Sequence, residues 1–275
     1  MSSFFVGTSG WSYPTWRGDF YPPGLVHRRE LEYLSHRTTS AEINGSFYSL
    51  QRPSSYAAWR DQTPDDFVFA VKGGRFITHL KRLHDVGPAL ANFFASGVLA
   101  LPPQLGPILW QLPARQPYDA DLLEAFFSLL PRDTTQAERL AQQHDDKIKE
   151  SRTLTRATSY TPLRHALEPR HDSFLEPEAA DLLRRHDIAM VLSDSAGRWP
   201  VIDRDTAGFR YVRLHGDTEL YTSGYSPEAL DRWTARCRTW SAAGQDVYVY
   251  FDNDAKGYAP HDAVGLLARL TESAH

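Results

Sequence analysis

The sequence predicts an α/β fold: a single TIM-barrel-like (β/α) barrel of parallel strands that spans residues 1–275. Three observations support this fold. Strand-like and helix-like patterns alternate along the whole chain, no shift in composition separates two domains, and 275 residues is a common length for a one-domain barrel. A hydrophobic content of 41% supplies the side chains for a substantial core.

Eight strands are predicted from short runs rich in β-branched and aromatic residues. The clearest run, Val-Tyr-Val-Tyr-Phe, occupies residues 247–251. Since successive side chains of a strand point to opposite faces, Val249 and Phe251 are expected to pack against helices, and Tyr248 and Tyr250 to point into the barrel. The predicted strands are residues 3–8, 38–44, 67–72, 107–112, 163–170, 187–194, 209–215 and 246–252.

Capping residues mark the ends of the helices between these strands. Ser226 is a suitable N-cap, Pro227 fits the first helical position, and Gly244 can follow the last helical residues. Another helix opens at residues 176–178, Glu-Pro-Glu, and its apolar period ends near His186. Such helices would form the outer layer of the barrel.

Two connections depart from this simple alternation. Residues 113–162 are too long for a plain connection, and we expect a long helical insert with helices at 119–130 and 134–149. Residues 195–208 contain two glycines and a proline and show no helical period. This second connection is therefore expected to lack a regular helix.

The carboxyl-terminal halves of several predicted strands carry polar side chains where a barrel interior normally holds bulky apolar ones. Glu168 and Arg170 share one face of a strand, because they are two residues apart, and Arg213 and His215 share a face of another. Catalytic groups of such barrels come from these strand ends, so we predict a charged pocket there. The polar set is Glu42, Asn44, Lys72, Glu168, Arg170, Arg213, His215 and Asp252.

A charge network that only fills the barrel is the alternative to a pocket. Removing one ion from water costs several kcal/mol, and the whole stability of a domain is only about 5–15 kcal/mol. Apolar side chains would fill the same space at least as well. We therefore favour a binding or catalytic pocket.

The polar residues lie in ordered motifs. These motifs are Gly-Thr-Ser-Gly-Trp-Ser-Tyr at 7–13, Glu-Ile-Asn at 42–44, Phe-Ala-Val-Lys at 69–72, Ile-Thr-His at 77–79, Glu-Pro-Arg-His at 168–171, Arg-Leu-His-Gly at 213–216 and Tyr-Val-Tyr-Phe-Asp-Asn-Asp at 248–254.

Together these motifs resemble the YecE-like family, also known as domain of unknown function 72, over nearly the whole chain. The resemblance implies a TIM-barrel-like fold and, for most members, no established activity. The sequence departs from the family pattern at Phe174, where a tryptophan is expected, and over residues 131–162, which match no part of that pattern.

Lys72, Arg170 and Arg213 predict that the pocket binds a small anionic or phosphate-bearing ligand. In the favoured hypothesis they hold a phosphate group, for example that of a nucleotide or nucleic acid, and neighbouring residues catalyse hydrolysis. The predicted catalytic residues are Glu42, Glu168, His215 and Asp252. Further ligand contacts are predicted for Trp11, Tyr13, Asn44, Tyr48, Arg75, His79, His171, Tyr225 and Asn253.

Two other functions are left open by the sequence. In one, Glu42 and Glu168 form the carboxylate pair of a glycoside hydrolase, with a separation of about 5–5.5 Å or 6.5–9.5 Å. A much larger gap, or binding of both carboxylates to arginines, would rule this function out. In the other, the protein is a non-catalytic module that recognises nucleic acid or protein through aromatic side chains around the pocket. This predicted aromatic rim consists of Trp11, Tyr13, Trp16, Phe47, Tyr48, Tyr221 and Tyr225.

No cofactor is predicted, and a divalent metal is the alternative. His79, His171 and His215, together with the acidic residues of the pocket, are acceptable ligands for zinc or manganese. However, three basic side chains would share the cavity and repel such an ion. No motif for dinucleotides or for the phosphates of a nucleoside triphosphate is present.

Net charge, cysteine content and the length of the apolar segments limit the kinds of partner that this protein can have. A net charge of −4 argues against a general nucleic-acid binder. Cys237 is the only cysteine, which excludes an intrachain disulfide. No apolar stretch reaches the length of a bilayer and no signal segment precedes the first strand, so we expect a cytoplasmic protein without a membrane partner. The sequence indicates no particular protein partner.

Overall fold

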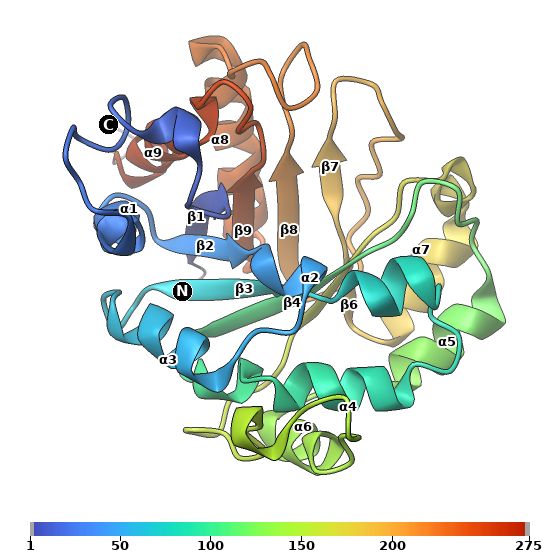
Figure 1. Cartoon of the computed structure of the whole chain (residues 1–275). Coiled ribbons are helices and arrows are strands. Elements are labelled where there is room, and N and C mark those ends of the chain that lie inside the picture. Colours follow the sequence, from blue (N-terminus) through green and yellow to red (C-terminus); the bar gives the residue numbers. More distant parts are fainter. Residues whose placement is uncertain (1–2, 273–275) are drawn as a thin grey trace.

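The strands of residues 3–272 pair in parallel, as the sequence predicts. The computed structural model describes residues 3–272, and its sheet has the strand order β6-β5-β4-β3-β2-β1-β9-β8-β7 (Figure 1). The strands are β1 Phe4–Ser9, β2 Ser40–Ile43, β3 Val68–Lys72, β4 Leu105–Gln111, β5 His165–Glu168, β6 Ile188–Met190, β7 Leu192–Asp194, β8 Phe209–Leu214 and β9 Asp246–Phe251.

The predicted strand at residues 187–194 is divided in two. Its first half, β6, pairs with β5, and its second half, β7, pairs with β8. Val191 lies between the halves, and its N–H donates to Leu167 O at 2.9 Å. Because the two halves are consecutive in the chain, this divided strand brings the edges of the sheet together and makes a nearly closed barrel.

Helices form the outer layer. Helix α9 packs on β1 and beside α8, while α4 and α6 pack against each other (Figure 1). Within residues 3–272, no helix has the length and apolar character needed to cross a bilayer. The helices are α1 Glu30–Ser35, α2 Gly45–Tyr48, α3 Pro53–Asp61, α4 Gly87–Ala95, α5 Ala120–Leu129, α6 Thr134–Ala141, α7 Pro177–Arg185, α8 Pro227–Ala242 and α9 Tyr258–Thr271, with a π-helical turn, η3, at Phe76–Leu80.

The structure confirms that residues 195–208 contain no helix, but it shortens one predicted helix. The prediction of a helix at 134–149 is wrong beyond Ala141, where α6 ends. The reason is a tertiary contact: Asn92 of α4 donates to the Asp145 side chain at 2.8 Å and accepts from the Asp145 N–H at 3.0 Å. These two bonds hold the chain in a turn instead of a helix.

The barrel has two apolar layers. Val249 and Phe251 belong to the large core between sheet and helices, and Tyr248 and Tyr250 belong to a smaller cluster inside the barrel, as the alternation predicts. Tyr211 joins this inner cluster. The inner rings fill the barrel below the carboxyl ends of the strands, which leaves those ends for the polar residues.

Candidate functional site

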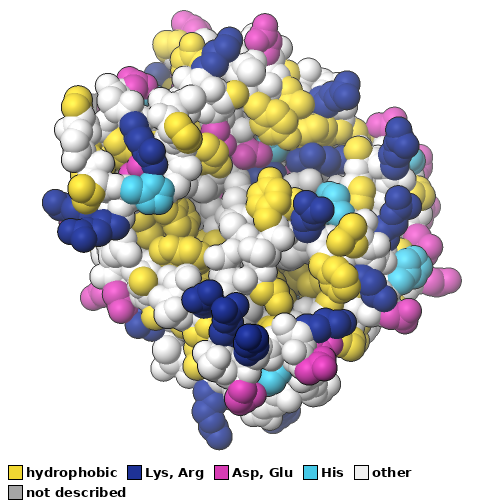
Figure 2. Space-filling view, in the orientation of Figure 1, with side chains coloured by type: hydrophobic (Ala, Val, Ile, Leu, Met, Phe, Trp, Pro, Cys, Tyr) yellow, Lys and Arg dark blue, Asp and Glu magenta, His cyan; other side chains and the backbone are white. Residues whose placement is uncertain are grey.

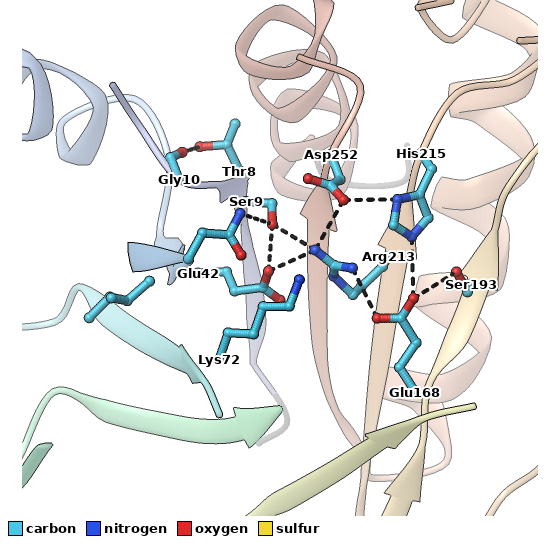
Figure 3. A network of polar contacts seen from close by, with 12 residues as sticks. Thr8, Ser9, Gly10, Glu42, Lys72, Glu168, Ser193, Arg213, His215 and Asp252 are labelled. Atoms are coloured by element: carbon cyan, nitrogen blue, oxygen red, sulfur yellow. Dashed lines mark hydrogen bonds and ion pairs between the residues drawn. The ribbon is translucent and has the colours of Figure 1, made fainter. Parts of the chain in front are cut away.

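Arg213, near the end of β8, is the centre of a buried ionic network. Its Nη1 donates to Glu168 at 2.9 Å, and its Nη2 donates to Glu42 at 2.8 Å and to Asp252 at 3.1 Å (Figure 3). The side chains of Arg213, Glu42 and Glu168 are fully buried. Burial alone would lower the pKa of Arg213, but the three carboxylates outweigh it and raise this pKa well above its usual value.

The carboxylate of Glu42 is satisfied by protein groups. Its Oε1 accepts from the Ser9 hydroxyl as well as from Arg213, and its Oε2 accepts from the Tyr211 hydroxyl at 2.6 Å. Strand register explains the first contact, because Ser9 of β1 is paired with Glu42 of β2. Asn44 donates to the same Ser9 oxygen at 2.8 Å.

Glu168, at the end of β5, is bound by two arginines. Arg170 donates to its Oε1 from Nε at 3.1 Å and from Nη2 at 2.9 Å, while Arg213 binds the other oxygen. Burial would raise the pKa of Glu168, but the charges of Arg170 and Arg213 outweigh it and hold this pKa well below its usual value. Glu168 is therefore ionised at neutral pH.

Asp252 and His215 complete the network. His215 Nδ1 lies 2.9 Å from Asp252 Oδ2, and His215 Nε2 lies 3.6 Å from Glu168 Oε1. Neither ring nitrogen meets the geometry of a hydrogen bond in this structure. Burial opposes the charge of Asp252, but Arg213 and His215 keep its pKa below the usual value.

A cavity of about 670 Å³ opens above this network. The face of the molecule seen in Figure 2 is hollowed near its centre, and hydrophobic, basic, acidic and histidine side chains surround the hollow. Most of the lining comes from the carboxyl ends of β2, β3, β4, β5 and β9 and from the loops that follow. The lining residues are Tyr13, Asn44, Phe47, Tyr48, Lys72, Arg75, His79, Leu80, Gln111, Arg170, Tyr221 and Asp252.

Lys72, the last residue of β3, is the buried cation of this cavity that has no carboxylate partner. Lys72 is 8% exposed, and no residue between 3 and 272 forms an ion pair or side-chain hydrogen bond with its ammonium group (Figure 3). Its Nζ lies 4.5 Å from the centre of the Phe47 ring. Burial, and then repulsion by Arg213, lower the pKa of Lys72 to about 8.

Two further cations, Arg170 and Arg75, line this wall of the cavity. Arg170 stacks on Trp199, with 3.9 Å between its guanidinium carbon and the ring centre, and its Nη1 has no partner in the described part of the chain. Arg75 is exposed and likewise forms no ion pair with a described residue. Burial, followed by the charges of Lys72, Arg170 and Arg75, lowers the pKa of His79 to about 4.

The segment that carries Arg75 and His79 has an unusual backbone. Arg75 is the N-cap of the π-helical turn η3, His79 lies within this turn, and both line the cavity. Left-handed conformations follow at Arg82, Leu83 and Asp85. Each such conformation at a residue with a side chain costs about 1 kcal/mol or more. Functional sites are common places for π-turns and for strain of this kind.

Comparison with known proteins identifies the family. The family described as "Protein of unknown function DUF72" matches residues 5–275. This chain belongs to the DUF72 family. It is 30% identical over 128 residues to the UPF0759 protein YecE of Escherichia coli (strain K12), a match that covers 46% of this chain and 44% of YecE. The matched region thus spans less than half of that curated relative.

Solved structures of DUF72 proteins share the fold. A DUF72 family protein from Thermotoga maritima MSB8 superposes with a TM-score of 0.75 at 24% identity, covering 98% of this chain and 100% of the other. A DUF72 family protein from Enterococcus faecalis V583 superposes with a TM-score of 0.72 at 16% identity, covering 99% and 97%. At these identities the likeness shows the TIM-barrel-like fold alone.

In this DUF72 protein, half of the predicted site residues line the cavity. They are Tyr13, Asn44, Tyr48, Lys72, Arg75, His79, Arg170 and Asp252. The sequence-based list of ligand contacts omitted Gln111, Leu80, Phe47 and Tyr221, which also line it. Gln111 is the last residue of β4 and is paired with Glu168 of β5. Its position at the end of a predicted strand could have identified it as a cavity residue. Leu80 had no such signal, since η3 alone brings it to the cavity.

Two other predicted ligand contacts, Tyr225 and Asn253, do not line this cavity. The Tyr225 hydroxyl is buried and bonds Asp194 and the Gly216 N–H. Asn253 is buried and bonds Asp262. In each case a side chain expected at the pocket stabilises a loop behind it.

Three further residues that were predicted at the pocket, His171, Trp16 and Trp11, do not line this cavity. His171 caps the 3₁₀ helix at Asp172–Leu175 and does not line the cavity. Trp16 is fully buried in the main core, so it is not a rim residue. Trp11 packs on that core and lines a second cavity of about 380 Å³ together with Trp59.

The predicted catalytic residues Glu42, Glu168 and His215 are fully buried beneath the cavity, and none of them lines it. The glycoside hydrolase alternative fails for the same reason: both carboxylates are bound to Arg213 and inaccessible to a sugar. Asp252 is the one predicted catalytic residue that lines the cavity.

The predicted metal ligands do not form a donor set. Among residues 3–272, no three histidine, cysteine, aspartate or glutamate side chains are grouped so that they could hold a metal ion. Glu42, Glu168 and Asp252 surround the guanidinium of Arg213 instead, which places a positive charge where a metal would sit.

Proposed function

We propose that the cavity binds a small anionic ligand, carrying a phosphate or a carboxylate, between Lys72, Arg75 and Arg170. The observation that carries this proposal is Lys72, a residue only 8% exposed whose ammonium group meets the cavity without an ion pair to any described residue. A buried charge without a partner is costly. An anion in the cavity would offset that cost.

Arg213 is left out of this anion site, although its sequence position suggested a ligand contact. Its two Nη atoms already bind three carboxylates, and its side chain is fully buried. We assign it a positioning role: it holds Glu42, Glu168 and Asp252 below the ligand. Arg170 combines both roles, because it binds Glu168 and still has Nη1 free for an anion.

The aromatic residues of the cavity suit the body of the ligand. Phe47, Tyr48 and Tyr221 offer ring surfaces next to the cations. A volume of about 670 Å³ is in the usual range for small-molecule sites and exceeds what inorganic phosphate needs. The ligand therefore has an organic part that packs on these rings.

Catalysis on such a ligand would run through Asp252. It is ionised at neutral pH, since Arg213 and His215 keep its pKa low, and its Oδ1 has no partner in the described part of the chain. An ionised carboxylate with one free oxygen can accept a proton. Glu168, whose oxygens are both engaged by arginines, cannot serve as that base.

The proposal is tested by calorimetry and thermal unfolding with sulfate, phosphate, pyruvate and dihydroxyacetone phosphate. We expect saturable binding and a rise in melting temperature, both lost in Lys72→Met and kept in Lys149→Met, which removes an exposed lysine outside the cavity. Equal binding by the two variants would contradict the proposal. Binding of an oligonucleotide with no effect of the small anions would favour the nucleic-acid alternative.

The pH dependence of sulfate binding is a second test. Sulfate keeps its charge between pH 6 and 10, so a change in affinity reports on the protein. Binding should weaken as the pH rises through about 8, where Lys72 loses its proton, with a midpoint moved upward by the bound anion. Lys72→Arg should bind sulfate without this decline, because arginine stays charged.

A further inference from the structure

We propose that Lys72 is also a nucleophile, which forms an imine with the carbonyl carbon of a small anionic aldehyde or ketone bound in the cavity. This inference rests on the proposed anion site and names its substrate class: an oxo compound that carries a carboxylate or a phosphate group. The observation behind it is the environment of the Lys72 amine, which lies on the cavity wall beside Phe47.

The Nζ atom of Lys72 differs from that of an ordinary lysine in what surrounds it. It lies at the end of β3 on the cavity wall, and its close neighbour is the face of the Phe47 ring, 4.5 Å away. By contrast, Lys147 is 69% exposed and paired with Asp145 at 3.6 Å. An amine that is desolvated, unpaired and open to a cavity is the form in which lysine attacks carbonyl groups.

A useful fraction of this amine is neutral at physiological pH. With a pKa of about 8, roughly a tenth of Lys72 lacks its extra proton at pH 7. An exposed lysine is neutral in well under about a hundredth of that proportion. The neutral fraction of Lys72 therefore has a lone pair available for attack on a carbonyl carbon.

The rest of the cavity fits a substrate with one carbonyl and one anionic group. Arg75 and the free Nη1 of Arg170 can take the anionic end, which leaves Lys72 for the carbonyl carbon. The protonated imine has the same charge as the lysine that it replaces. Glu42, Asp252 and Glu168, whose negative charges act on Lys72, would stabilise it in the same way.

The chemical step balances within the site. The Nζ lone pair forms a C–N bond to the carbonyl carbon, and the carbonyl electrons move to its oxygen, which gives a carbinolamine after proton transfer. Asp252 Oδ1 can accept the proton from nitrogen and return it to the hydroxyl group. The C–O bond then breaks and water leaves, so that amine and carbonyl yield imine and water without an oxidant or reductant.

Reductive trapping tests the inference. The protein is incubated at pH 7 with cyanoborohydride and pyruvate, dihydroxyacetone phosphate or acetone, and adducts are located by peptide mass spectrometry. We expect adducts at Lys72 with the anionic compounds, at least about tenfold faster than at Lys149, because far more of the Lys72 amine is neutral. Acetone, without an anionic group, should react much more slowly. Faster trapping of pyruvate would indicate a site for a carboxylate, and faster trapping of dihydroxyacetone phosphate would indicate a site for a phosphate.

Two measurements separate this inference from the proposed anion site. Lys72→Arg should abolish trapping and keep the rise in melting temperature with sulfate. If wild-type protein shows that rise but no adduct at Lys72, imine formation is refuted and anion binding stands. If adducts spread evenly over exposed lysines and no anion raises the melting temperature, both proposals fall.

Discussion

Arg213 donates to Glu168 at 2.9 Å, and neither side chain has any exposed surface. These two residues are 45 positions apart and come from β8 and β5, across the barrel interior. The same guanidinium also binds Glu42 and Asp252, so one cation links three carboxylates from three other strand ends. The pair therefore connects the strands at the carboxyl end of the barrel, and the cavity lies directly above it.

Replacing Arg213 by methionine should strongly destabilise the barrel. The substitution leaves Glu42, Glu168 and Asp252 buried without their common partner, and breaking a buried pair typically costs about 3–5 kcal/mol. Urea unfolding followed by circular dichroism measures this loss. Arg75→Met is the matched control: it removes an exposed arginine that forms no ion pair within residues 3–272, and it should change stability by less than about 0.5 kcal/mol. Equal stability of the two variants would mean that the ionic network around Arg213 contributes nothing to the free energy of unfolding.

Acid should weaken the fold through the carboxylates of the network. The pKa values of Glu168 and Asp252 are lower in the folded protein than in the unfolded chain, so the unfolded state binds more protons as the pH falls below about 4. Their stabilisation is complete above that pH and is lost as the pH falls toward the folded-state pKa values. Melting temperatures between pH 7 and 3 measure this slope. Glu168→Gln should flatten it, and an unchanged slope would exclude Glu168 as a cause.

Lys72→Met should make the protein more stable at neutral pH while it removes anion binding. The pKa of Lys72 falls from 10.5 to about 8 on folding, which corresponds to a cost of about 3 kcal/mol for keeping the ammonium form. Wild-type stability should therefore rise between pH 8 and 10.5, where the unfolded chain keeps a proton that the folded protein loses. The advantage of Lys72→Met should shrink over the same range. If Lys72→Met were less stable than the wild-type protein at pH 7, the ammonium group of Lys72 would stabilise the fold and the prediction would be wrong.

Two aromatic substitutions separate the core from the rim. Trp16→Ala should cost about 3–5 kcal/mol, because Trp16 is fully buried among Tyr13, Phe20 and Tyr21. Tyr48→Ala should change stability by less than about 0.5 kcal/mol, since Tyr48 is 70% exposed, but it should weaken binding of an organic anion. Denaturant unfolding and calorimetry with dihydroxyacetone phosphate give the two readouts. If Trp16→Ala were as stable as the wild-type protein, Trp16 would not be a core residue and its assignment to the rim would stand.

Much of the architecture followed from local patterns. The alternation of side chains along residues 246–252 put Tyr248 and Tyr250 inside and Val249 and Phe251 outside, because a strand has only two faces. The absence of a helical period in residues 195–208 predicted the missing helix. Local patterns could not place the end of α6, which depends on a contact with Asn92 from another helix.

The sequence by itself determined that charged residues would gather at the carboxyl ends of the strands, since their spacing puts them on the inner face of a parallel barrel. Only the tertiary structure decided which of these charges are paired. Arg213 reaches three carboxylates at the barrel axis, whereas Lys72, from a strand end with the same pattern, reaches none. The difference lies in distance across the barrel: an ion pair forms only within about 4 Å, and no sequence spacing encodes how far apart two strand ends lie in space.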